Sequence, residues 1–186
     1  MDETNIVTLI IAGFGFVSTL LAYILPKLID NYYNEKKERK KRREDIIIQI
    51  KKLSIEAGKI ASTIYNYILE NSKIPEKYTI TLVTKENEEK ESHFLHPDSP
   101  LKFLLNKLDE SSLKLTDLSS DAYTYSEAKD LQEKFYDLIL ELSEYQMLLE
   151  EKIRTQKIRQ HDDLVQIKNK LEKVIKKIAE VGLIQL

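Results

Sequence analysis

Residues 128–149 read AKDLQEKFYDLILELSEYQMLL, and their apolar side chains recur at alternating steps of three and four residues. This spacing places one apolar seam along one side of an α-helix. Such a helix is stable in water mainly when neighbouring helices cover the seam. The stretch therefore predicts a helical bundle or antiparallel coiled-coil hairpins. The seam consists of Ala128, Leu131, Phe135, Leu138, Leu142, Tyr145 and Leu149.

Similar spacing predicts three further helices. The helix over 46–69 carries the seam Ile46, Ile50, Leu53, Ile60 and Ile64, with additional isoleucines that favour packing on more than one neighbour. The helix that starts near Pro100 carries leucines as far as Leu118, and we expect Ser119–Asp121 to interrupt it. The last helix carries the seam Leu164, Ile167, Leu171, Val174 and Ile178. The pattern leaves open whether 126–181 is one helix or two with a break near 160.

The segment from 74 to 99 differs from the helical segments around it. Residues 78–84 (YTITLVT) are rich in β-branched side chains, and residues 92–96 can return as a second short strand. We therefore predict a short β-hairpin insert around residues 78–96. The alternative is an exposed, irregular insert between helices, because an isolated hairpin is only marginally stable.

The N-terminal residues 6–25 (IVTLIIAGFGFVSTLLAYIL) contain no charge. As a helix, about twenty residues at ~1.5 Å each cover the ~30 Å hydrocarbon core of a bilayer, which predicts a transmembrane helix. Basic residues follow the span, whereas only Asp2 and Glu3 precede it, so we expect the N-terminus outside and the C-terminal domain in the cytoplasm of the cell. A cleaved signal peptide is the alternative, but its basic start and small-residue cleavage site are lacking.

These features give a mainly α-helical fold in four parts. We predict an extracytoplasmic tail at 1–5, a transmembrane helix at 6–25, a basic juxtamembrane segment at 26–45 and a cytosolic helical domain at 46–186. The zero cysteine count fits a reducing compartment.

Two sets of residues on the first helix are candidates for binding. Small residues recur on one side of the predicted span, where they allow close helix packing in lipid or occur there by chance: Thr8, Ala12, Gly15, Thr19 and Ala22. The basic residues after the span are expected to contact lipid headgroups and to set the topology: Lys27, Lys36, Lys37, Arg39, Lys40, Lys41, Arg42 and Arg43.

The sequence favours neither catalysis nor a cofactor. No phosphate-binding loop, nucleophile elbow or zinc-protease motif occurs. His93 and His96, with Asp98 and two nearby glutamates, have the elements of a metal site, but their spacing is more typical of surface histidines. The net charge of −2 and the absence of interleaved aromatic residues argue against nucleic-acid binding. We expect no metal, no small-molecule substrate and no enzymatic activity.

The expected function is therefore that of a membrane-anchored interaction or scaffold module, whose partners are the lipid bilayer and other proteins or further copies of this chain. One alternative is a structural subunit: over its first fifty residues the layout resembles the peripheral-stalk b subunits of rotary ATP synthases. Those subunits are nearly uninterrupted helices, whereas this chain carries the proline-bounded insert. Another alternative is a membrane-perturbing effector of the toxin, holin or phage-defence type that oligomerises through its span.

Overall fold

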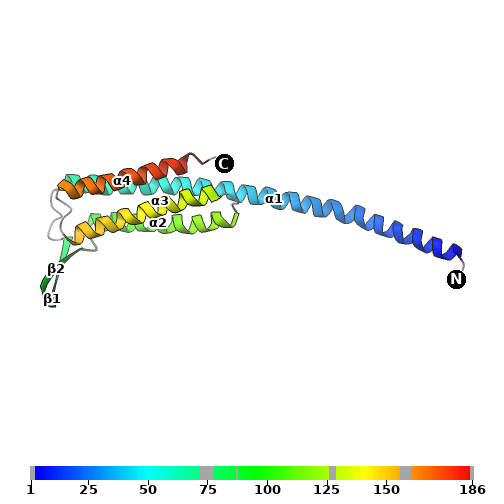
Figure 1. The fold of residues 1–186 in the computed structure, drawn as a ribbon, viewed down its shortest axis with the longest axis horizontal. Coiled ribbons are helices and arrows are strands. Elements are labelled where there is room, and N and C mark those ends of the chain that lie inside the picture. Colours follow the sequence, from blue (N-terminus) through cyan, green and yellow to red (C-terminus); the bar gives the residue numbers. More distant parts are fainter. Residues whose placement is uncertain (1–2, 72–77, 87, 126–128, 156–160, 185–186) are drawn as a thin grey trace. The chain divides into compact units, whose positions relative to one another are not determined.

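The computed structural model describes residues 3–71, 78–86, 88–125, 129–155 and 161–184. In five stretches it describes the backbone without the side chains: 3–17, 82–86, 88–92, 123–125 and 129–130. The described elements are, in chain order, α1 (Glu3–Glu70), β1 (Thr79–Glu86), β2 (Glu88–Leu95), α2 (Pro100–Tyr125), α3 (Lys129–Arg154) and α4 (His161–Gly182) (Figure 1).

The chain divides into two compact units, Met1–Arg42 and Arg43–Leu186. The first unit is the N-terminal part of α1, and the second contains the rest of α1 together with all the other elements. Pro26 lies inside α1 without ending it. The basic segment after Pro26 is therefore helical throughout.

The second unit is a bundle in which consecutive helices run antiparallel. Lys51 of α1 donates a hydrogen bond to the carbonyl of Ile184, which follows α4, over 2.5 Å. Tyr145 of α3 donates to the carbonyl of Ala61 in α1 over 3.0 Å. Figure 1 shows α2, α3 and α4 alongside the C-terminal part of α1. The prediction of a mainly helical bundle with a small antiparallel sheet is confirmed.

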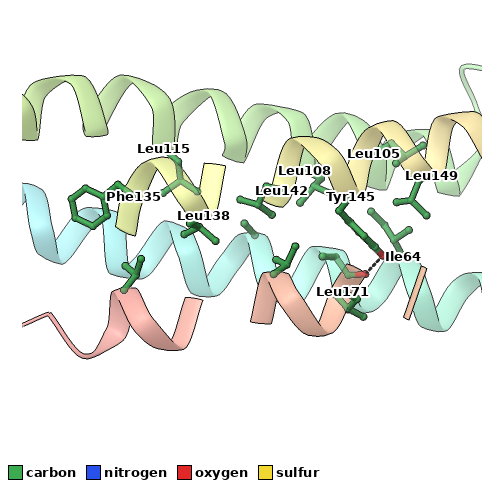
Figure 2. Packing of buried hydrophobic residues seen from close by; sticks show 14 of the residues in the cluster. Ile64, Leu105, Leu108, Leu115, Phe135, Leu138, Leu142, Tyr145, Leu149 and Leu171 are labelled. Carbon is green, nitrogen blue, oxygen red and sulfur yellow. Dashed lines mark hydrogen bonds between the residues drawn. The ribbon is translucent and has the colours of Figure 1, made fainter. Parts of the chain in front are cut away.

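The core of the bundle runs along α3 (Figure 2). All six described residues of its predicted seam are buried: Leu131, Phe135, Leu138, Leu142, Tyr145 and Leu149. Ile167, Leu171 and Val174 of α4 are also buried, whereas Leu164 and Ile178 are half-buried and pack against the same cluster. A seam at alternating steps of three and four is buried on these helices because one face of each points into the bundle.

On α1 the buried face is displaced from the predicted seam. Ile50 and Ile64 are buried, but Ile46, Leu53 and Ile60 are only half-buried and pack at the edge of the core. The remaining positions of the buried face are Ile47, Ser54, Ala57, Ala61 and Ile68. The displacement arises because α1 packs on both α3 and α4. The buried face of α1 is therefore broader than a single heptad seam and is centred on different residues.

Gly58 accounts for the close approach of α1 and α4. A Cβ atom at position 58 would lie 2.6 Å from Cδ1 of Ile178, closer than side-chain carbons approach one another. The absence of a side chain at Gly58 thus leaves room for the isoleucine between the two helices.

The predicted interruption of the second helix at Ser119–Asp121 is wrong, because α2 continues to Tyr125. Ala122 is buried and extends the apolar face of α2 by another turn beyond the serines. Serine and aspartate disfavour a helix by only about 0.5 kcal/mol per residue relative to alanine. Packing of this turn against the core outweighs that cost.

The β-hairpin is present within the predicted residues 78–96, and its two strands are longer than predicted. β1 and β2 pair antiparallel from Thr79 opposite Leu95 to Glu86 opposite Glu88, so the charged residues 85–91 are mostly within the strands rather than in a broad loop. The backbone N–H of His96 donates to the carbonyl of Tyr78 over 2.7 Å and extends this pairing. Leu95 packs against the core of the bundle, which supplies the support that an isolated hairpin lacks.

The break near residue 160 separates two helices. α3 ends at Arg154 and α4 begins at His161, and the two helices pack side by side in opposite directions. The intervening residues 156–160 lie outside the described part of the chain.

Candidate functional site

The described part of the first unit exposes a long apolar surface. Every residue of α1 from Ser18 to Arg42 is exposed, including nine large apolar or aromatic side chains. They are Leu20, Leu21, Tyr23, Ile24, Leu25, Leu28, Ile29, Tyr32 and Tyr33. An exposed apolar patch of this extent on a protein marks a surface that contacts lipid or another protein. This apolar segment, 20–33, is the first candidate site.

Aromatic and basic side chains interact along the apolar segment. The ammonium group of Lys27 donates a hydrogen bond to the hydroxyl of Tyr23 over 2.7 Å and lies 4.2 Å from the centre of its ring. The rings of Tyr32 and Tyr33 meet edge to face, with centroids 6.1 Å apart. Tyrosine and lysine side chains with an apolar body and a polar tip are typical of the boundary between lipid and water.

The basic cluster 36–42 follows directly on the same helix. It contains Lys36, Lys37, Arg39, Lys40, Lys41 and Arg42, all exposed. Arg39 lies 4.0 Å from Glu35, and Arg42 lies 4.0 Å from Glu38. At this distance, and with more than half of each side chain exposed, these pairs contribute little to stability. The cluster therefore remains accessible to an external anion.

Arg43 differs from the other predicted headgroup ligands. It is half-buried, its Nε atom is buried without a hydrogen-bond partner in the described structure, and it lines a small cavity with Ile47, Ala122 and Phe135 of the bundle. The Arg43 side chain thus packs within the second unit. We therefore remove Arg43 from the residues expected to face lipid.

The predicted small-residue face is described only in part. Thr19 and Ala22 are exposed on α1, whereas the side chains of Thr8, Ala12 and Gly15 lie outside the described residues. In the described part of the chain, no helix is long and apolar enough to cross a membrane. The predicted transmembrane helix at 6–25 is therefore not supported, and the side chains of its residues 6–17 lie outside the described residues.

A cavity of about 360 Å³ forms a second candidate site in the bundle. It lies between β2, the start of α2 and the end of α3, and the exposed side chains of Phe94 and Met147 contribute to its wall. Charges of both signs surround it, with Lys102 and Arg154 opposed by Glu150 and the neighbouring Glu151. The cavity thus combines an apolar wall with charged groups of both signs.

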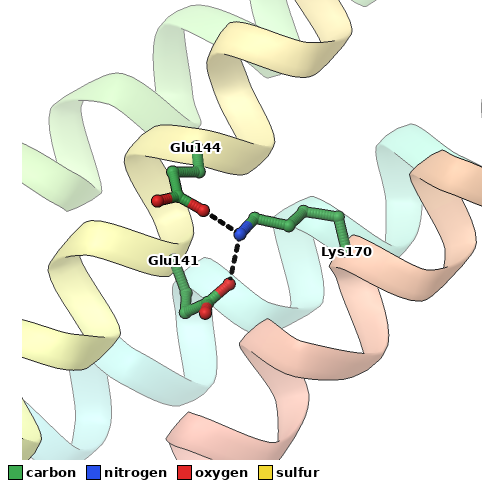
Figure 3. A network of polar contacts seen from close by, with 3 residues as sticks. All are labelled: Glu141, Glu144 and Lys170. Atoms are coloured by element: carbon green, nitrogen blue, oxygen red, sulfur yellow. Dashed lines mark hydrogen bonds and ion pairs between the residues drawn. The ribbon is translucent and has the colours of Figure 1, made fainter.

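Among the described residues, four ion pairs made by three lysines join α3 to α4, and no pattern in the sequence indicates their partners. Lys177 contacts Asp137 at 2.7 Å, and Lys152 contacts Asp163 at 2.5 Å. Between them, Lys170 bridges two carboxylates of α3, at 2.6 Å from Glu141 and in close contact with Glu144 (Figure 3). Burial works against the charge of Lys170, but hydrogen bonds to Glu141 and Glu144 raise its pKa. The contacts lie about one heptad apart and fix the register of the two helices.

Acidification is expected to weaken the ion pair between Glu144 and Lys170. The hydrogen bond and the charge of Lys170 hold the pKa of Glu144 below its ordinary value of 4.5. A carboxyl group with a lowered pKa stabilises the folded state above pH 4.5, and this contribution is lost as the pH falls through the folded-state value. Melting temperatures followed by circular dichroism should therefore fall less steeply below pH 4.5 in Glu144→Gln than in the parent. Glu172→Gln, which removes an exposed carboxylate of α4, is the control and should retain the parent's slope.

The two histidines of the hairpin do not form a metal site in the described structure. His96 Nδ1 lies 3.5 Å from Asp98 and accepts a hydrogen bond from the Asp98 backbone N–H, while His93 Nδ1 lies 3.0 Å from the hydroxyl of Thr81. The described residues contain no group of three or more His, Asp or Glu arranged to hold a metal ion. The side chains of Glu89 and Glu91 lie outside the described residues.

The chain matches no family model, no curated protein and no solved structure in comparisons with all three.

Proposed function

We propose that this chain is a single-pass membrane protein whose helical bundle serves as a protein-interaction or scaffold module at the cytoplasmic face. The exposed apolar segment 20–33 of α1, followed by the basic cluster 36–42, carries the proposal. A helix with exposed apolar side chains and no packing partner is costly in water, and the hydrocarbon of a bilayer covers such side chains. The predicted span at 6–25 overlaps the start of this segment.

Orientation follows from the charges around the segment. Basic residues close to a spanning helix stay on the cytoplasmic side, and here the basic cluster lies only on the C-terminal side of the span. The proposal therefore places the N-terminus outside and the bundle in the cytoplasm. Attachment to the membrane raises the effective concentration of the bundle for partners at the same surface.

The outer face of α3 supports the interaction role. Tyr136, Leu140 and Met147 are exposed at spacings that place them on one side of the helix, and Met147 also lines the 360 Å³ cavity. Exposed aromatic, leucine and methionine side chains are typical of surfaces that adapt to protein partners. We propose this face, together with the cavity, as the partner-binding surface of the bundle.

Alkaline extraction of cell membranes tests the anchor. We expect the full-length chain to stay in the membrane pellet, and Phe14→Arg/Val17→Arg, which places two arginines near the middle of the predicted span, to move largely to the soluble fraction. Each arginine at the centre of a spanning helix costs about 2.5–3.5 kcal/mol of insertion free energy. Leu113→Arg/Leu183→Arg adds the same charges to exposed leucines of the bundle and should remain in the pellet. Complete extraction of the unaltered chain would contradict the anchor.

A further inference from the structure

Side chains of three kinds follow one another along the exposed part of α1. The apolar side chains lie at 20–29, the paired rings of Tyr32 and Tyr33 come next, and the basic cluster 36–42 follows. This order of apolar, amphipathic and cationic groups matches the order of acyl chains, interface and phosphates in one leaflet of a bilayer.

The basic side chains of the cluster differ in whether they pair with acidic residues of the chain. Arg39 and Arg42 each face a glutamate one turn away, and Lys40 also takes part in an interaction. Lys36, Lys37 and Lys41 have no ion-pairing partner among the described residues. Lys37 and Lys41 stand four residues apart and therefore share one face of the helix.

We propose that the basic cluster binds the phosphate headgroups of anionic phospholipids, with Lys36, Lys37 and Lys41 as its principal ligands. The inference rests on the proposed membrane attachment and adds selectivity for the charge of the lipid. Anionic phospholipid is favoured over nucleic acid because the apolar and tyrosine side chains lie on the same exposed helix. A lipid surface covers both, whereas a nucleic-acid backbone would leave the apolar side chains in water.

The test uses the full-length protein in mixed detergent micelles. The chain contains no cysteine, so Asn34→Cys gives a single labelling site for an environment-sensitive dye at an exposed position beside the cluster. Phosphatidylglycerol is titrated into the micelles, and phosphatidylcholine replaces it in a parallel series. We expect the dye to respond to phosphatidylglycerol alone. Lys37→Gln/Lys41→Gln should raise the half-saturating fraction of phosphatidylglycerol, by about fivefold for each lysine.

A matched variant controls for net charge. Lys173→Gln/Lys176→Gln removes two exposed lysines from α4 and should leave the titration unchanged. Equal responses to the two lipids, or equal shifts in the two double variants, would overturn the inference. A short DNA duplex is also titrated, and a dye response as strong as that to phosphatidylglycerol would reassign the cluster to nucleic acid.

The outcome is separable from that of the anchor test. Retention in the pellet after alkaline extraction, combined with equal responses to both lipids, would preserve the anchor and overturn headgroup selectivity. Extraction of the protein, combined with a selective response to phosphatidylglycerol, would support headgroup binding by a surface-attached helix and contradict the span.

Discussion

Replacing Lys152 with methionine is expected to lower the free energy of unfolding of the bundle by about 3–5 kcal/mol. Lys152 and Asp163 form an ion pair of 2.5 Å in which only 11% and 7% of the two side chains are exposed. Methionine keeps the length of the side chain but leaves the Asp163 carboxylate buried without its counter-charge. Removal of one member of a buried pair costs more than the pair itself contributes, because the remaining charge has lost its hydration. Urea unfolding followed by circular dichroism measures the change.

Two further variants separate pairing from packing. Lys152→Met/Asp163→Leu removes both charges and should recover most of the lost stability, since apolar side chains of similar volume can replace a buried ion pair. Lys168→Met breaks the exposed pair with Glu172, at 3.8 Å, and should change the stability by no more than about 0.5 kcal/mol. Similar losses for Lys152→Met and Lys168→Met would show that the α3–α4 pair is not buried in solution.

Replacing Phe135 with alanine is expected to cost a similar amount, about 3–5 kcal/mol of unfolding free energy. Phe135 is 2% exposed and packs in the cluster near Leu115 and Leu138, as Figure 2 shows. It also borders the small cavity beside Arg43, so truncation would enlarge an existing void rather than create an isolated one. Two terms make up the loss of unfolding free energy. The alanine variant buries less apolar area on folding, and the residues that line the enlarged cavity lose van der Waals contacts.

The adjacent residue provides the control. Tyr136 is 66% exposed on another face of α3, so Tyr136→Ala should change the free energy of unfolding by no more than an ordinary surface substitution does, about 0.5 kcal/mol. The same variant is expected to impair capture of a protein partner by the outer face of α3. If the two alanine variants had the same urea midpoint, the seam assigned to α3 would be wrong.

The sequence predicted the buried face of α3 better than that of α1. On α3 the seam from Leu131 to Leu149 is buried throughout, because the predicted seam coincides with the face that points into the bundle. On α1 the heptad rule selected Ile46, whereas Ile47 is the buried residue. Two neighbouring helices share that face, and periodicity alone does not show how their contact areas overlap.

The amino-acid composition of short segments predicted helix and strand ends wrongly where packing or strand pairing extended the element. Ser119–Asp121 has the composition of a helix end, yet α2 continues because Ala122 is buried one turn further on. The hairpin was predictable from its β-branched first strand. Its extension into the charged residues 85–91 was not, because backbone pairing depends on the opposite strand rather than on the side chains of one segment.

By itself, the sequence determined that this chain forms long amphipathic helices with a hairpin insert, and that apolar and basic residues follow one another near its N-terminus. These properties depend on side chains a few residues apart. Only the tertiary structure decided which charges are buried and paired. No pattern in the sequence marks Lys152 or Asp163 as buried, and Arg43 was predicted as one more member of a basic run. Their environments are set by helices distant in the sequence, whose register no local pattern records.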